Sequence, residues 1–395
     1  MKKTGQKTRW LLPDGVQEVV PPLGENLEAL RRNVLDTMKS WGYQLVIPPS
    51  LEYLDSLLTG LGPDLNLQTF KLVDQITGKT LGIPADITPQ IARIDFNINP
   101  SARIGRYCYA GPVLHTLPDG FAGSRNPLQI GAELFGHEGS ESDAEIITLL
   151  LEVLSVAGIK EPNLELGDMG LFRGICELAN FDENQEELVL NSLLKKNVEE
   201  IKVLLDSFSV DEEVQELFLS LLKLNGGTEV LRDAAKAFAN GPVELLRALE
   251  SLEELVHLLH IRNPNLAIGI DLAELKGYRY HSSTTFSVYT PSVGRAIAWG
   301  GRYKVSNDTS VQREATGFSV DLRTLFSLGE ITPNEQLVVV APHLNEPDLH
   351  DAIDKLRATG NVVVQSLPSV GVESIDERST KQLVKRKGEW VLEDI

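Results

Sequence analysis

The stretch that decides the fold is Gln129-Ile130-Gly131-Ala132-Glu133-Leu134-Phe135. Successive side chains of a β-strand point to opposite faces of the sheet, so every second residue shares a face. The three residues at even positions are apolar and suit a hydrophobic core. At odd positions Gln129 and Glu133 flank a glycine, so an amide, a gap and a carboxylate fall together. The alternation predicts a strand that lines a polar pocket, although a half-solvated sheet face would give the same pattern.

Helices and strands are mixed around this stretch. Apolar residues at helical spacing predict helices over 23–41, 142–157 and 322–326. Another helix is expected to begin at Thr88-Pro89, an N-cap followed by proline at the first helical position. The expected strands cover 43–47, 70–73, 80–83, 103–109, 128–137, 266–270, 285–289, 295–299 and 317–320. Hairpins combined with helices predict an α+β core.

The length of 395 residues allows several domains, and the patterns predict four parts. These are a first half of the α+β core (1–180), an inserted lobe of four or five helices without strands (181–262), a second half of the core (263–330) and a small C-terminal α/β unit (331–395).

The C-terminal unit is predicted to contain a strand, a helix and a strand, at 336–341, 346–358 and 361–365. After these elements only 389–392 is expected to be ordered. The basic residues of this region are interpreted as part of a solvated, partly disordered tail, because runs of like charge are usually solvated. They are Lys381, Lys385, Arg386 and Lys387.

Composition narrows the class of protein. Hydrophobic residues make up 42% of the chain and charged residues 24%, which is typical of a globular domain. No apolar run is long enough to span a bilayer, and no signal region follows the start, so we expect a cytoplasmic protein with no membrane partner. Cys108 and Cys176 fit no metal or redox spacing. The net charge of −19 does not by itself exclude RNA, but no nucleic-acid partner is expected.

Some polar residues suit the binding of a small cationic or heterocyclic ligand. Glu133 can accept a hydrogen bond from an imidazole N–H, and Gln129 can donate or accept one. Asp86 lies just before a predicted helix start, where a simple capping role is the alternative. The combination of Gln129 and Glu133 would suit a histidine side chain.

Several segments, taken together and in order, resemble motifs of the histidyl-tRNA synthetase family. They are the strand quoted above, Ile83-Pro84-Ala85-Asp86-Ile87-Thr88, Gly111-Pro112-Val113-Leu114-His115-Thr116-Leu117, Leu275-Lys276-Gly277-Tyr278-Arg279-Tyr280-His281, Gly300-Gly301-Arg302-Tyr303 and Gly317-Phe318-Ser319-Val320-Asp321-Leu322-Arg323-Thr324. The resemblance implies a class II aminoacyl-tRNA synthetase-like antiparallel sheet with flanking helices, an inserted all-α lobe and a C-terminal α/β remnant. It also implies a site for L-histidine formed by Asp86, Thr88, Gln129, Glu133, Tyr280, His281 and Lys276.

The chain departs from the synthetase pattern where the family handles ATP. His115 and Thr324 replace two family arginines, and Leu117 replaces a glutamate. Lys276 keeps the charge of a further arginine but loses its bidentate geometry. Transfer at a phosphate needs such charges, so these changes imply that the chain is not an enzyme and holds no cofactor or metal.

In these departures the chain resembles the family of ATP phosphoribosyltransferase regulatory subunits, which are paralogues of the synthetase. That resemblance implies a partner, the short-form catalytic subunit, which the chain would activate and make sensitive to histidine. It also implies a homodimer within a hetero-octamer-like complex. Two alternatives stay open: a divergent histidyl-tRNA synthetase or other ATP-dependent amino-acid ligase, and a scaffold whose pocket is a relic.

Overall fold

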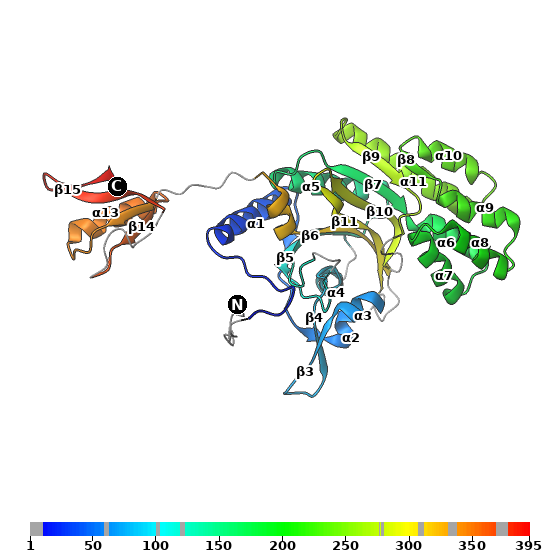
Figure 1. Cartoon of the computed structure of the whole chain (residues 1–395), viewed down its shortest axis with the longest axis horizontal. Helices are drawn as coiled ribbons and strands as arrows, with labels where there is room; N and C mark the ends of the chain where they lie inside the picture. Colours follow the sequence, from blue (N-terminus) through cyan, green and yellow to red (C-terminus); the bar gives the residue numbers. More distant parts are fainter. Residues whose placement is uncertain are drawn as a thin grey trace, which may run out of the picture. The chain divides into compact units, whose positions relative to one another are not determined.

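The computed structural model describes residues 11–58, 63–99, 103–118, 123–275, 277, 280–306, 312–330, 338–368 and 378–395. The chain divides into two compact units, residues 1–331 and 332–395 (Figure 1). The finer division at residues 180, 262 and 330 stays a prediction.

The first unit is built on a nine-stranded sheet. In chain order its strands are β1 (Gln44–Leu45), β5 (Gly105–Pro112), β6 (Leu128–Phe135), β7 (Asn163–Asp168), β8 (Asn225–Gly227), β9 (Ala267–Asp271), β10 (His281–Thr290), β11 (Val293–Ser306) and β12 (Gln312–Asp321). Their order in the sheet is β1-β5-β6-β12-β11-β10-β7-β9-β8, and every neighbouring pair from β5 to β7 is antiparallel. The antiparallel core predicted from the sequence is therefore present.

One face of the sheet carries the main hydrophobic core. The apolar residues of β6, Ile130, Ala132 and Leu134, are all buried in it, as their alternation predicted. Helices α1 (Leu23–Ser40) and α5 (Ser140–Val156) contribute their apolar residues to the same core. α5 is followed by Gly158 at φ 74°, a left-handed position where glycine ends the helix without strain.

The opposite face is covered over β5 and β6 by helix α4 (Thr88–Ile98) and a second, smaller core. The predicted N-cap is wrong by one residue, since Ile87 is the cap and Thr88 is already helical. The reason is chemical: the Thr88 hydroxyl donates to a buried carboxylate instead of capping the helix. Beside α4 lie a three-stranded sheet and two short helices, β2 (Glu52–Tyr53), β3 (Phe70–Val73), β4 (Thr80–Ile83), α2 (Leu54–Leu58) and α3 (Pro63–Gln68). The predicted hairpin is β3–β4.

The strand predicted over 43–47 is mostly absent. The strand itself covers only Gln44 and Leu45, which are both exposed, and the N–H of Val46 makes one further bond to the carbonyl of Cys108 on β5 at 2.9 Å. Tyr43 is buried in the main hydrophobic core and its hydroxyl donates to Glu145 at 2.9 Å, but it is not part of the strand. β1 lies at an open edge of the sheet, where one side of the ladder has no partner among the described residues.

The region between residues 163 and 262 contains the strand β7, six helices and, between the fourth and fifth of these helices, the short strand β8. The helices are α6 (Met169–Leu178), α7 (Glu183–Leu194), α8 (Val198–Ser207), α9 (Glu212–Leu221), α10 (Val230–Ala237) and α11 (Val243–Arg262). The prediction of no strand here is wrong, because β8 pairs antiparallel with β9. Gly226 and Gly227 form β8, and their lack of side chains removed the alternation that identifies a strand. No described helix is long and apolar enough to cross a lipid bilayer.

The second unit is a four-stranded sheet with one helix on it. Its elements are β13 (Val338–Ala341), α13 (Pro347–Ala358), β14 (Val362–Gln365), β15 (Ser379–Arg386) and β16 (Glu389–Asp394), and the sheet order is β14-β13-β15-β16. Helix α13 contributes Leu349 and Ile353 to a small core with β13, β14 and β15.

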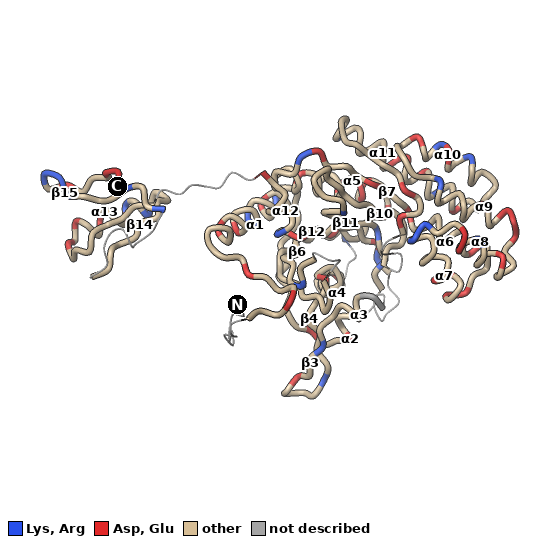
Figure 2. Tube along the Cα trace, viewed as in Figure 1, with Lys and Arg blue, Asp and Glu red and all other residues tan. Residues whose placement is uncertain are grey.

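The predicted disordered tail is wrong, because it forms the hairpin β15–β16. Lys387 and Gly388 have φ of 50° and 91°, as a two-residue hairpin turn requires. The positions of Lys and Arg residues are coloured blue along the trace near this turn in Figure 2. Their side chains are largely paired, and Arg386 makes two bonds to Glu393 at 2.7 and 2.9 Å. The charge run is therefore part of an ordered hairpin.

Candidate ligand site

The start of α4 and the polar face of β6 bring two predicted carboxylates close together. The Gln129 amide donates to Asp86 Oδ1 at 2.7 Å, and its oxygen accepts the backbone N–H of Ile87 at 2.9 Å. Asp86 Oδ1 also accepts the N–H of Thr88 at 3.0 Å, as an Asx turn at a helix start would. Gln129 is buried, so this face of β6 is not a solvated sheet face.

Glu133 is the most buried charge-bearing group of this site, with 1% of its surface exposed. Its carboxylate accepts from the hydroxyls of Thr88 at 2.9 Å and Tyr303 at 2.8 Å, and more weakly from Tyr109 at 3.4 Å. Burial raises the pKa of Glu133 to about 8, despite these hydrogen bonds, because the charged form loses its hydration. The side chain is therefore mostly protonated at neutral pH.

Glycines on the neighbouring strands make room for this carboxylate. Gly317 on β12 lies directly opposite Glu133, and a side chain there would overlap Glu133 Oε2. Gly301 on β11 lies opposite Gly317, and a Cβ there would lie 2.8 Å from His281 Nδ1. Across the sheet, Glu133 is thus followed by two glycines, Gly317 on β12 and Gly301 on β11, which have no side chains to fill the space beside the carboxylate.

Tyr280 and His281 border the same cluster. The Tyr280 ring stacks on the Tyr303 ring with 4.8 Å between centroids, and it lies 5.2 Å from the His281 ring. The Tyr280 hydroxyl and His281 Nδ1 are buried and have no hydrogen-bond partner of good geometry among the described residues. Burial lowers the pKa of His281 to about 4, so its imidazole is neutral. Lys276, the remaining predicted site residue, lies outside the described residues.

Two residues of this cluster were not predicted as site residues. Tyr303 belongs to the quoted Gly-Gly-Arg-Tyr segment and shares a face of β11 with Gly301, so the two-residue period was a usable signal. Tyr109 is fully buried on β5 and is the cross-strand partner of Gly131. Nothing in the sequence pairs β5 with β6 in that register, so Tyr109 could not be assigned.

Arg302, the residue before Tyr303, points to the other face of the sheet. Its guanidinium pairs with Asp143 at 3.0 Å and donates to the carbonyls of His137 and Gly139, each at 2.8 Å. Both charged side chains are buried. Arg302 therefore fastens β11 to the start of α5 and does not contact Glu133.

Of the residues that were interpreted from the sequence as replacing ATP-handling side chains, His115 and Thr324 have local hydrogen-bond partners. His115 Nε2 lies 2.9 Å from the carbonyl of Ala85, and Leu117 is exposed. The Thr324 hydroxyl donates to Asp321 at 2.9 Å at the start of α12 (Leu322–Leu328). Arg323 donates to the carbonyl of Gln17 at 3.0 Å.

Comparison with known proteins places these features in families. The histidyl-tRNA synthetase family model matches residues 15–325, and the model described as ATP phosphoribosyltransferase subunit HisZ C-terminal domain matches residues 336–393. The chain is 47% identical to a protein of Alkalilimnicola ehrlichii, covering 91% of this chain and 90% of the relative. It is 43% identical to one of Nitrosococcus oceani, covering 98% and 97%. Both relatives are named ATP phosphoribosyltransferase regulatory subunit.

Solved structures confirm the predicted fold class. An ATP phosphoribosyltransferase regulatory subunit/histidyl-tRNA synthetase from Bacillus halodurans matches with a TM-score of 0.79 at 23% identity, covering 93% of this chain and 96% of that one. The histidyl-tRNA synthetase of Nostoc sp. PCC 7120 matches with a TM-score of 0.77 at 18% identity, covering 98% and 97%. At these identities the likeness establishes the synthetase-like fold alone.

Proposed function

This chain belongs to the family of ATP phosphoribosyltransferase regulatory subunits, and we propose from that membership that it regulates the catalytic subunit of that enzyme in histidine biosynthesis. It activates the short-form catalytic subunit and transmits feedback inhibition by L-histidine. Feedback requires histidine to bind one state of the complex better than another, and a coupling of roughly 1–3 kcal/mol is typical of such regulation.

The observation that carries the ligand assignment is the cluster around Glu133. A histidine side chain has a ring nitrogen that donates and one that accepts. Here the Tyr280 hydroxyl and His281 Nδ1 are buried and have no hydrogen-bond partner of good geometry among the described residues, and Tyr280 stacks on the tyrosine that donates to Glu133. We propose that Glu133 and Tyr280 bind the imidazole and that Gln129 and His281 line the rest of the histidine pocket. Buried polar groups are costly when unpaired, so a ligand that pairs them gains affinity.

The ammonium group of the same ligand would bind Asp86, with Thr88 beside it. Asp86 is held by Gln129 at 2.7 Å, so its carboxylate is positioned before the ligand arrives. The carboxylate of histidine would then need a cation, for which Lys276 is proposed from the sequence alone.

We propose that the chain has no ATP-dependent catalysis of its own and needs no cofactor. This is supported by the partners of the altered positions, since His115 is bonded to Ala85 and Thr324 to Asp321. A divergent synthetase or amino-acid ligase is not favoured by the family membership. Histidine-dependent exchange of pyrophosphate into ATP by the purified chain would contradict the regulatory proposal.

The assembly proposed is a homodimer within a hetero-octamer-like complex in the cytoplasm. The segment after α1 supports a subunit contact, because Leu45 and Ile47 are 50% and 83% exposed beside the open sheet edge at β1. Exposed apolar residues of this kind are common in protein interfaces.

The experiment that tests the site is replacement of Asp86 by alanine. Asp86→Ala should abolish inhibition of the complex by histidine and the heat of histidine binding, while complex formation is unchanged. Asp74→Ala is the matched control, because Asp74 is a carboxylate whose side chain bonds only within the β3–β4 turn. Full sensitivity to histidine in Asp86→Ala would show that the ligand site is elsewhere.

A further inference from the structure

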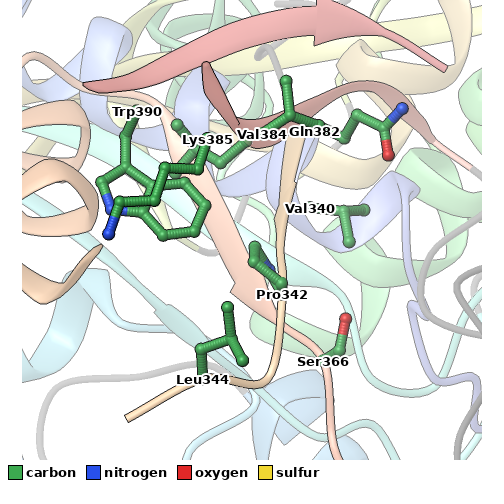
Figure 3. Close-up of a pocket in the computed structure, with 9 residues that line it drawn as sticks. Val340, Pro342, Leu344, Ser366, Gln382, Val384, Lys385 and Trp390 are labelled. Atoms are coloured by element: carbon green, nitrogen blue, oxygen red, sulfur yellow. The ribbon is translucent and has the colours of Figure 1, made fainter. Parts of the chain in front are cut away.

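The C-terminal unit contains a pocket that the proposed histidine site does not use. Its volume is about 290 Å³. Side chains of β13, the loop after it, β15 and β16 surround it, as Figure 3 shows. The lining residues are Val340, Pro342, Leu344, Ser366, Gln382, Leu383, Val384, Lys385 and Trp390.

The pocket exists because β13 ends before its neighbour β15 does. β13 and β15 are paired as far as Val340 and Gln382. Pro342 follows, and proline has no N–H to continue the ladder. β15 runs on to Arg386, and over this overhang it is paired only with β16 among the described residues.

The overhang offers free backbone groups on the side that β13 has left. Arg386 and Glu389 flank the two-residue turn, so they form a hydrogen-bonded pair with each other. Pairs alternate along an antiparallel ladder, and therefore the N–H and C=O of Lys385 point away from β16. No described residue bonds to them there. A strand in this place would find the donor and acceptor that strand addition uses.

The chemistry of the lining favours an apolar occupant. Valine, leucine and proline side chains and the indole of Trp390 make up most of the wall. Its cation, Lys385, is already paired with Glu346 at 2.6 Å and Asp348 at 2.8 Å, so the rim carries no excess positive charge for an anion. The volume lies near the lower end for small-molecule sites, which begin at roughly 300 Å³, and suits one large apolar side chain.

We propose that this pocket and the overhang of β15 bind an extended segment of the catalytic subunit by strand addition, with one large apolar side chain in the pocket. The proposal rests on the regulatory function argued above. The synthetase family model ends at residue 325, whereas residues 336–393 match the model of the regulatory subunit's own C-terminal domain. We therefore expect the contact with the catalytic subunit to lie in this C-terminal domain, which is the part that separates the regulatory subunit from the synthetase family.

The test uses the full chain and the catalytic subunit. Leu344→Asp places a charge in the pocket wall at a residue that is 44% exposed, so folding should not depend on it. Leu367→Asp is the matched control, since Leu367 is 67% exposed in the same unit and does not line the pocket. Titration calorimetry should show the complex weakened by roughly tenfold or more for Leu344→Asp, as for other buried interface anchors. The control should bind normally, and both variants should bind histidine as the unaltered chain does.

Hydrogen exchange gives a second readout that needs no substitution. The amide of Lys385 should exchange more slowly in the complex than in the free chain. Unchanged exchange there, or unweakened binding by Leu344→Asp, would overturn strand addition while leaving the regulatory function intact. Loss of self-association by Leu344→Asp alone would show that the pocket joins two copies of this chain instead. Failure of the unaltered chain to bind the catalytic subunit would contradict the proposed function itself.

Discussion

Replacing Glu133 by glutamine should remove a pH dependence from the stability of the protein. The pKa of Glu133 rises from an ordinary value of 4.5 to about 8 in the folded state, because its carboxylate is buried. Between these values the folded chain keeps a proton that the unfolded chain has lost. The free energy of unfolding therefore falls as pH rises through this window and levels off above about 8.

The size of the effect follows from the same two values. At about 1.36 kcal/mol per pH unit, the shift corresponds to about 5 kcal/mol. Glu133→Gln does not titrate, so the stability of the original chain relative to this variant should fall by about that amount between pH 4.5 and 8. Glutamine preserves the shape, and its amide can donate to the Tyr303 hydroxyl, which now donates at 2.8 Å.

Urea unfolding followed by circular dichroism at one-unit steps from pH 5 to 9 measures this difference. Asp168→Asn is a useful control, because burial raises the pKa of Asp168 to about 7. This variant should lose the fall in unfolding free energy that Asp168 causes at lower pH, between about 4 and 7. Parallel stability curves for the original chain and Glu133→Gln between pH 5 and 8 would refute the claim that Glu133 is buried and mostly protonated.

Two further substitutions test the supports of the site. Arg302→Met should lower the free energy of unfolding in urea by about 3–5 kcal/mol, because it leaves Asp143 buried without its ion-pair partner; a loss below about 1 kcal/mol would contradict that pairing. Gly317→Ala should abolish the heat of histidine binding, because its methyl group would displace the Glu133 carboxylate, whereas Gly294→Ala, with open space around it, should bind normally. Equal binding by both glycine variants would mean that Glu133 does not contact the ligand.

The sequence predicted what local periodicity determines. The apolar stripe of α1, the alternation in β6 and the β3–β4 hairpin are all as expected, because each depends on neighbours along the chain. The basic tail was misinterpreted because its lysines and arginine do not alternate with apolar residues, so the strand β15 has no two-residue period in its sequence.

Contacts between strands that are far apart along the chain could not be predicted from the sequence. The residue Gly317 pairs with Glu133 across 184 positions, and Tyr303 reaches the same carboxylate from a different strand. The two-residue period places Tyr303 on the same face as Gly301, but which strands bring Gly317 and Tyr303 to Glu133 depends on the order of strands in the sheet. The altered family positions could be read from the resemblance, but the carbonyl that His115 contacts could not.

Consecutive residues of β11 serve opposite sides of the same layer. On one face Tyr303 donates to the Glu133 carboxyl group, and on the other face Arg302 donates to carbonyls of the loop before α5. These two contacts are made by consecutive residues, so only one peptide unit separates the attachment on one face of the sheet from the attachment on the other. A ligand that contacts Tyr303 therefore binds one residue away from a buried ion pair on the opposite face of the sheet.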